Sequence, residues 1–490
     1  MTGIVAAGHP LTAEAGAAVL RAGGNAVDAA VAAMLTSWAA EPLLTGPGAG
    51  GYMLVAGAGE TPVLLDFFVE APGRGRAREA SAELMPVEVS FGDAVQLFNC
   101  GAASCGTYGT PAGVCSAVER WGSVPLAELA APAAALAREG VALNAQQAYV
   151  FALLDGILRS TPQAAAIFAP AGPVLREGER FRAPELADAI ELLGAQGAAP
   201  FYTGVVAERV AAWLGERGGL LTREDLAAYQ AVAREPVGVS YRGRDVLTNP
   251  PPSAGGVLLA LALALLDRRP PPPRAIDLVE VMERAQAERT GAFVAGLAAP
   301  GFADGFLASR LGATTHISVL DGAGRACSVT CTNGEGSGIV VPGTGVHLNN
   351  MMGEEDLNPL GFHAFAPGRR MPSMMAPTVV LSADGAVELV LGSAGSNRIR
   401  SAILQTIAGV VDHGRGVQAA VDAARLHFEE GIVYAEPGID LDGLRAAGRA
   451  VAPFRAPNLF FGGVQAVARA ADGTLSGGAD PRRGGVVARA

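Results

Sequence analysis

The chain has 490 residues, half of them hydrophobic and 17% charged, with a formal net charge of −11. This length and composition provide enough apolar material for a large core. No cluster of Lys and Arg forms the basic surface that nucleic-acid binding requires, so we exclude that class of function.

The N-terminal segment shows neither the basic region nor the long apolar stretch of a signal peptide. We therefore expect a cytoplasmic protein. The most apolar run, Gly256 to Leu266, is too short to cross a bilayer and predicts a buried helix instead. No membrane association is expected.

The first part of the chain is predicted to be rich in helices. Residues 12–42 carry apolar side chains at three- and four-residue spacing, interrupted by Gly23 and Gly24. This pattern predicts two helices joined by a glycine turn. Two strands are expected next, after a glycine-rich loop at 46–51, and 125–221 is expected to be mostly helical.

The last third changes to alternating, β-branched segments, which predict three hairpins at 314–333, 377–395 and 462–483. A helix is expected at 397–414, closed by Gly414. Helices first and antiparallel hairpins later indicate sheets covered by helices in one layered unit.

Cysteine and histidine usage predicts no metal site. The five cysteines are an odd number, and no two of the six histidines stand at metal-ligand spacing. Two glycine loops also lack the order or the ending of a nucleotide fingerprint, so we expect no cofactor. One of them, Gly392 to Arg398, runs from strand to helix and offers backbone N–H groups to a developing anion.

Eight segments in chain order together resemble the γ-glutamyltranspeptidase family, and they span nearly the whole chain. They are GGNAVDAAVAA, EPLLTGPGAGGYMLV, PPPSAGG, TTHISVLDGAGRACSVTCTN, VPGTGVHLNN, SMMAPT, GSAGSNRI and GGADPRR. One such segment would be weak support, but eight in the family's order are specific.

The resemblance implies an α+β fold, the four-layer αββα sandwich of N-terminal-nucleophile hydrolases. It implies an inactive precursor that cuts itself between Ala313 and Thr314. Residues 1–313 would form the large portion and 314–490 the small portion of one intertwined unit, a heterodimer of its own fragments.

The chemistry of such a cut is understandable by itself. A threonine hydroxyl is a poor nucleophile until a base takes its proton, and a free α-amine titrates near neutrality, at about 7.7–8.0. Cleavage would therefore give Thr314 its own base, because an amide nitrogen cannot accept the proton.

The resemblance assigns further residues to the reaction centre. Thr332 stands at the family's spacing from Thr314 and matches its second threonine, whose hydroxyl bonds the nucleophile. The backbone N–H groups of Gly395 and Ser396 match the oxyanion hole. Without the resemblance, the threonines would be strand-face residues and His316 a packed sheet histidine. Asp480 and Arg482 would be turn and surface charges.

The substrate-binding positions depart from the family pattern. Asn333 and Ser373 match positions that hold the α-carboxylate or α-amino end of the substrate. Phe68, however, replaces the arginine that pairs with the carboxylate, and Met351 replaces a polar amine-binding side chain. Glu354 stands where aspartate is usual.

Met374 replaces one serine of the family's pair, so the donor site becomes more apolar while the catalytic residues are kept. Phenylalanine cannot supply a bidentate contact to a carboxylate. Either another arginine takes over that role or the acyl donor is not γ-glutamyl. The candidates for the first option are Arg369, Arg370 and Arg398.

We therefore predict an amide hydrolase or acyltransferase that works through an acyl-Thr314 intermediate, with water or an amine as acceptor. Its small-molecule substrates would include γ-glutamyl compounds such as glutathione. An acylase for another amide, for example a β-lactam side chain, is the enzymatic alternative. A non-catalytic binding protein on the same scaffold is the third.

Overall fold

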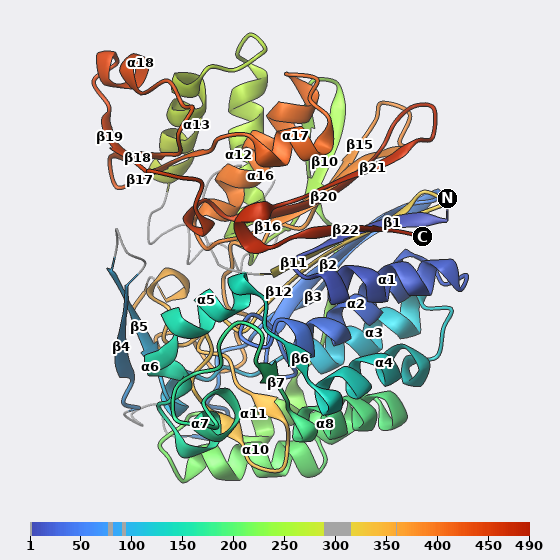
Figure 1. The fold of residues 1–490 in the computed structure, drawn as a ribbon, viewed down its shortest axis with the longest axis vertical. Helices are drawn as coiled ribbons and strands as arrows, with labels where there is room; N and C mark the ends of the chain where they lie inside the picture. Colours follow the sequence, from blue (N-terminus) through green and yellow to red (C-terminus); the bar gives the residue numbers. More distant parts are fainter. Residues whose placement is uncertain (1, 77–81, 91–94, 289–314, 359) are drawn as a thin grey trace.

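The computed structural model describes residues 2–76, 82–90, 95–288, 315–358 and 360–490. Two antiparallel sheets pack face to face at its centre, with helices on both outer sides (Figure 1). This confirms the expected α+β fold with four αββα layers.

Strands from distant parts of the chain alternate in the first sheet, whose order is β22-β1-β11-β12-β2-β3-β8. The two central strands, β11 and β12, are flanked by strands from the first part of the chain. Their bounds are β22 (Val486–Arg489), β1 (Gly3–Ala7), β11 (Thr315–Asp321), β12 (Arg325–Thr332), β2 (Gly50–Gly57), β3 (Glu60–Phe67) and β8 (Val232–Arg234).

The second sheet has the order β21-β20-β16-β15-β10-β9 and lies against the first through β16 and β20. It contains two of the three predicted hairpins, and the first sheet contains the third, so all three are confirmed. Its strands are β21 (Leu475–Ala479), β20 (Gly463–Arg469), β16 (Val387–Ala394), β15 (Thr378–Leu381), β10 (Arg244–Thr248) and β9 (Val237–Tyr241).

Helices cover the first sheet in two tiers. The tier on the strands is α1 (Pro10–Arg21), α2 (Ala26–Ala40) and α3 (Thr110–Trp121). Every residue of α2 is buried, because α1, α4 and the sheet surround it. The other helices on this side are α4 (Leu126–Glu139), α5 (Ala145–Leu153), α6 (Asp155–Leu158), α7 (Pro162–Phe168), α8 (Pro184–Gln196), α9 (Ala199–Tyr202), α10 (Val205–Gly215) and α11 (Arg223–Ala228).

The second sheet is covered by helices from the middle and the end of the chain. The predicted buried helix at 256–266 is confirmed within α12. This group is α12 (Ala254–Asp267), α13 (Ala275–Ala287), α16 (Arg398–Val411), α17 (Val417–Asp422) and α18 (Leu441–Ala446). Among the described residues, no helix is long and apolar enough to cross a membrane.

Several short strands were not predicted from the sequence. β1 is a fully buried five-residue run, and a run this short shows no periodicity that separates strand from helix. The remaining pairs and triplets lie outside the two main sheets. They are β4 (Met85–Ser90) with β5 (Val95–Cys100), β6 (Val141–Ala142) with β7 (Arg180–Phe181), β13 (Val340–Val341) with β14 (Val346–His347), and β17 (Leu426–Glu429) with β18 (Ile432–Ala435) and β19 (Ala450–Pro453).

A buried histidine sits between the two sheets. The ring nitrogens of His316 lie 2.8 Å from Thr330 Oγ1 and 2.9 Å from Ser318 Oγ. A Cβ on Gly392 of β16 would lie 2.3 Å from the ring, so only glycine leaves room for it. Burial lowers the pKa of His316 to about 3, and the ring is therefore neutral. The expected packed sheet histidine is confirmed.

The interpretation of Asp480 and Arg482 as turn and surface charges is wrong about the surface. Asp480 begins the 3₁₀ turn η4 (Pro481–Arg483), but its side chain is fully buried. It pairs with Arg425 at 2.7 Å and Arg482 at 3.2 Å, and accepts from Val464 N–H. After η4 the chain continues as β22, which pairs with β1, and the charged side chains before it are buried. There they form ion pairs with one another.

We predict that acid destabilises the protein partly through His316. Its folded-state pKa lies below the unfolded value, so its contribution is complete above about pH 6.5 and is lost as pH falls towards 3. At about pH 4.5 the loss amounts to roughly 2–3 kcal/mol. Urea unfolding at pH 7.5 and 4.5 should show a smaller difference for His316→Gln than for wild type. The partly exposed His363→Gln is the control, and an unchanged pH dependence in His316→Gln would contradict the assignment.

We also predict that Asp480→Asn lowers the free energy of unfolding by about 3–5 kcal/mol, because the buried Arg425 loses its carboxylate and Arg482 keeps only that of Glu436. Asp472→Asn, at an exposed turn between β20 and β21, should change it by less than about 0.5 kcal/mol. Chemical denaturation of both variants measures the difference. Equal stability of the two would show that the buried charges are not coupled.

Candidate active site

The candidate site lies where β11 begins and β12 ends. Thr315 is the first residue of β11 and pairs with Cys331, the residue before Thr332. Thr332 itself pairs with Gly50 at the start of β2. The predicted nucleophile, Thr314, and the other side of the predicted cut, Ala313, lie outside the described residues.

Thr332 is buried at the entrance of a tight turn. Its Oγ1 accepts a hydrogen bond of 2.8 Å from the N–H of Gly334. The next residue, Asn333, donates its N–H to Leu44 O at 2.9 Å and accepts from the N–H of Asn350. The segments around Leu44 and Asn350 therefore hold this turn beside the start of β11.

The predicted oxyanion residues form a sharp turn between β16 and α16. Gly395 has a φ of +119° and Ser396 a φ of +54°, a conformation that a non-glycine residue adopts only under strain. A Cβ at Gly395 would lie 2.6 Å from Gly462 Cα, so the position requires glycine. The turn opens α16, whose N-terminus favours negative charge. The strand before it packs on His316 of β11 through Gly392.

Sequence reasoning missed Glu41, which joins the start of β11 to the helices. Its side chain accepts 2.8 Å and 3.0 Å hydrogen bonds from the hydroxyls of Thr12 and Thr315. Burial raises the pKa of this carboxyl, and the two hydroxyl donors oppose the shift. A Cβ on Gly8 would lie 2.6 Å from its Oε2. The available signal was a lone carboxylate directly after an apolar helix.

The predicted donor positions divide into an apolar wall and a polar edge. Phe68, Met351 and Met374 are fully buried members of one hydrophobic cluster. Phe68 stacks on Tyr52 with ring centroids 5.5 Å apart, and its carbonyl accepts from Tyr229 Oη. Phe68 is therefore part of the core.

The polar positions do not all meet. Glu354 lies with Asn350 over Gly334, beside Thr332, since a Cβ on Gly334 would come within 2.2 Å of Glu354 Oε1. Ser373 is held elsewhere, by the loop before α12: its carbonyl accepts from Ser253 Oγ at 3.0 Å.

Arg370, one of the three proposed replacement arginines, already forms hydrogen bonds and ion pairs within the protein. Arg370 is buried, bonds the Phe68 carbonyl and Tyr229, and lies 3.5 Å from both Asp66 and Glu70. Arg398 stacks on Phe460 and donates to its carbonyl, and Arg369 stacks on Phe365. Arg370 thus stabilises the chain at the end of β3 and is not available to bind a substrate.

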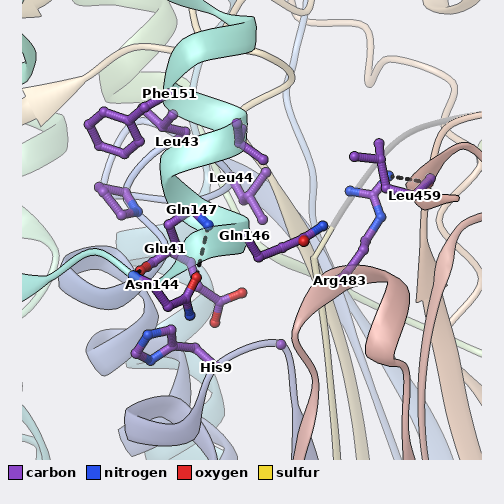
Figure 2. A pocket seen from close by; sticks show the side chains of 13 residues that line it. His9, Glu41, Leu43, Leu44, Asn144, Gln146, Gln147, Phe151, Leu459 and Arg483 are labelled. Carbon is purple, nitrogen blue, oxygen red and sulfur yellow. Dashed lines mark hydrogen bonds between the residues drawn. The ribbon is translucent and has the colours of Figure 1, made fainter. Parts of the chain in front are cut away.

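A pocket of about 60 Å³ opens on the α5 side of the same region (Figure 2). Gly8 and His9, the Glu41–Leu44 segment and α5 form one side, and Leu459 and Arg483 the other. Figure 2 shows Gln146 pointing from α5 towards Arg483. Since Glu41 bonds Thr315, this pocket reaches the start of β11.

Comparisons with known proteins find matches along nearly the whole chain. The family model for gamma-glutamyltranspeptidase matches residues 12–295 and 302–490. The acylase ACY 1 proenzyme of Pseudomonas sp. (strain SE83) is 32% identical, over 97% of this chain and 91% of its own length. The glutathione hydrolase proenzyme of Escherichia coli (strain K12) is also 32% identical, over 98% and 90%.

A solved structure is similar along the whole chain. The crystal structure of cephalosporin acylase from Bacillus halodurans covers 100% of this chain and 96% of its own, with a TM-score of 0.86 and 27% identity. The relatives thus include both hydrolases of glutathione and acylases, by their names.

Proposed function

The chain belongs to the γ-glutamyltranspeptidase family, and from this premise we propose that Thr314 is the nucleophile of an amide hydrolase or acyltransferase that cuts its own chain after Ala313. The observation that carries the proposal is the anchoring of Thr315. Its hydroxyl is bonded to Glu41 at the start of a central strand, one residue from the pairing position of Thr332, and the next residue, His316, packs against Gly392 of the strand that leads to the Gly395 turn.

In the first step, the Thr314 hydroxyl adds to the Ala313 carbonyl and the peptide N–C bond breaks, which leaves an ester and a free amine. Water then hydrolyses the ester and releases residues 1–313 from 314–490. The two fragments stay together because their strands alternate in the first sheet.

In turnover, the new α-amine takes the proton of the Thr314 hydroxyl as it attacks the substrate amide. The N–H groups of Gly395 and Ser396 stabilise the oxyanion, and Thr332 positions the nucleophile. The amine half leaves with a proton, and water or another amine releases the acyl group from Thr314.

For the donor, we propose an amide whose acyl part the enzyme recognises without binding an α-carboxylate. Phe68 is buried against Tyr52, and Arg370 is committed to Asp66 and Glu70. This favours an acylase-like specificity. The γ-glutamyl alternative is supported by Asn333, Ser373 and Glu354, which match the family's substrate-binding positions in the sequence.

We predict that the purified protein consists of two fragments, 1–313 and 314–490, and that Thr314→Ala remains one inactive chain. Removal of the hydroxyl abolishes both the self-cleavage and the acyl transfer. Intact-mass spectrometry and amide hydrolysis measure the two effects. Thr474→Ala, at an exposed turn, should be cleaved and active like wild type. A mature, active protein that is uncut at Thr314 would refute the proposal.

We predict that removal of the α-carboxylate from a γ-glutamyl donor does not reduce turnover. The matched pair is γ-glutamyl-p-nitroanilide and 4-aminobutyryl-p-nitroanilide, compared by kcat/KM. A site with a carboxylate-binding arginine would lose about tenfold or more on this change. An advantage of that size for the γ-glutamyl compound would show that another group has replaced the missing arginine.

A further inference from the structure

Asn397 directly follows the turn at Gly395 and Ser396 and stands at the N-terminus of α16, where asparagine is usually a helix cap. Here it does not act as one. Its backbone is helical, with a φ of −51° and a ψ of −25°, whereas a capping residue is normally extended. Its side chain makes no hydrogen bond to the N–H groups of the first turn of α16, which the structure describes in full. The side chain is therefore free to serve the turn instead of the helix.

The side chain of Asn397 is bonded to the edge of the small three-stranded sheet. Its Nδ2 donates to Oε1 of Glu429, the last residue of β17. Its Oδ1 has no hydrogen-bond partner among the described residues, so the contact with Glu429 orients the amide. Asn397 is 5% exposed and the Glu429 side chain 19%, so water competes little for this hydrogen bond.

Glu429 is held in turn by a buried histidine that leads back to α16. His427 Nε2 lies 3.4 Å from Glu429 Oε2, and His427 Nδ1 lies 2.8 Å from Oγ of Ser401, one helical turn along α16 from Asn397. The four side chains thus close a ring between β17 and the start of α16.

The Asn397–Glu429 hydrogen bond has an ionised acceptor. Burial alone would raise the pKa of Glu429, but its hydrogen bond with His427 and the nearby arginines lower that pKa to about 2. Burial lowers the pKa of His427 to about 4, although Glu429 opposes the shift, so the ring is neutral at neutral pH. A hydrogen bond to a carboxylate is stronger than one between neutral groups.

The turn before α16 needs such a contact, because its backbone is strained. Ser396 has a φ of +54°, and a non-glycine residue keeps this conformation only where the surrounding structure fixes it. Gly462 packs against the turn, since a Cβ on Gly395 would lie 2.6 Å from Gly462 Cα. From a second element, β17, Glu429 holds the residue that directly follows Ser396. The turn is thus fixed by packing at Gly395 and by a hydrogen bond at Asn397.

We propose that Glu429 is a positioning residue of the reaction, which acts through Asn397 to aim the N–H groups of Gly395 and Ser396 at the oxyanion. The inference rests on the proposed function. Glu429 does not contact the reacting atoms and exchanges no proton with them. Its contribution falls on the transition state, because the oxyanion forms only when the carbonyl is attacked. Such donors must keep their place to within about 0.5 Å, which a strained turn achieves only when it is held.

A double-mutant cycle between the two partners tests this role. Hydrolysis of p-nitrophenyl acetate, corrected for the rate of Thr314→Ala, gives kcat and KM, and its small acyl group makes little demand on the donor site. Glu429→Ala and Asn397→Ala should each lower kcat by about tenfold, whereas complete loss of an oxyanion donor costs about a hundredfold or more. KM should stay within about twofold, because ground-state binding does not use the oxyanion. The double variant should be no slower than either single variant, since both remove one contact.

Two matched variants separate the hydrogen bond from a general effect of substitution. Glu429→Gln keeps an oxygen that accepts from Asn397, so its kcat should stay within about threefold of wild type. Glu430→Gln changes the exposed neighbouring residue and should leave kcat unchanged. If Glu429→Ala does not fold, Asn397→Ala decides, because it removes the same hydrogen bond and leaves Glu429 beside His427.

Wild-type kcat in Asn397→Ala and Glu429→Ala would overturn the inference, as would additive losses in the double variant or a loss confined to KM. A Glu429→Gln variant as slow as Glu429→Ala would also contradict it. Intact masses are recorded for every variant. A wild type that is not cleaved at Thr314 refutes the proposed function, whereas a cleaved wild type whose kcat is insensitive to the two alanine changes refutes only the positioning role.

Discussion

The buried carboxyl of Glu41 is the contact on which the geometry of the site depends. It lies at the end of α2 and accepts hydrogen bonds from Thr12 of α1 and Thr315 of β11. A carboxyl without such partners would be costly to bury, so each hydroxyl stabilises it and is held by it in turn. These hydrogen bonds fix Thr315, the first residue of β11, to the helical layer. They hold the end of this strand in one position, whereas an unanchored strand end would fray.

The other parts of the candidate site are held near Glu41 and Thr315 by backbone hydrogen bonds and close backbone contacts rather than by long side chains. Asn333 and Leu44 join the turn after β12 to the segment after α2. Gly392 lets β16 approach His316 of β11, and Gly395 lets the turn after β16 approach Gly462, so closely that a Cβ would fit at neither position. Short side chains have few rotamers to lose on folding, which suits a site whose reacting groups must remain in register, whereas each glycine adds a cost in backbone entropy.

The two sides of the site have opposite chemistry. Phe68 and its methionine neighbours are buried in an apolar cluster, whereas Arg483 places a charge beside the turn at Gly395. The η4 turn, which ends at Arg483, is held in place by the buried ion pairs of Asp480 with Arg425 and Arg482.

The sequence by itself determined the fold class, the family and most helices and hairpins. The residues concerned interact locally or form ordered motifs, such as the glycine turn between α1 and α2 and the β11–β12 hairpin. The candidate threonines and the Gly395 turn were found in the same way. Their roles were carried over by the resemblance, since a threonine on a strand is ordinary.

The tertiary structure alone decided which groups meet. Glu41 and Thr315 are 274 residues apart, and Arg483 reaches Gly395 only because β22 returns to the edge of the first sheet. The burial of Asp480 and the commitment of Arg370 also follow from long-range packing. Periodicity and spacing describe neighbours along the chain, whereas charge pairing and pocket shape depend on neighbours in space.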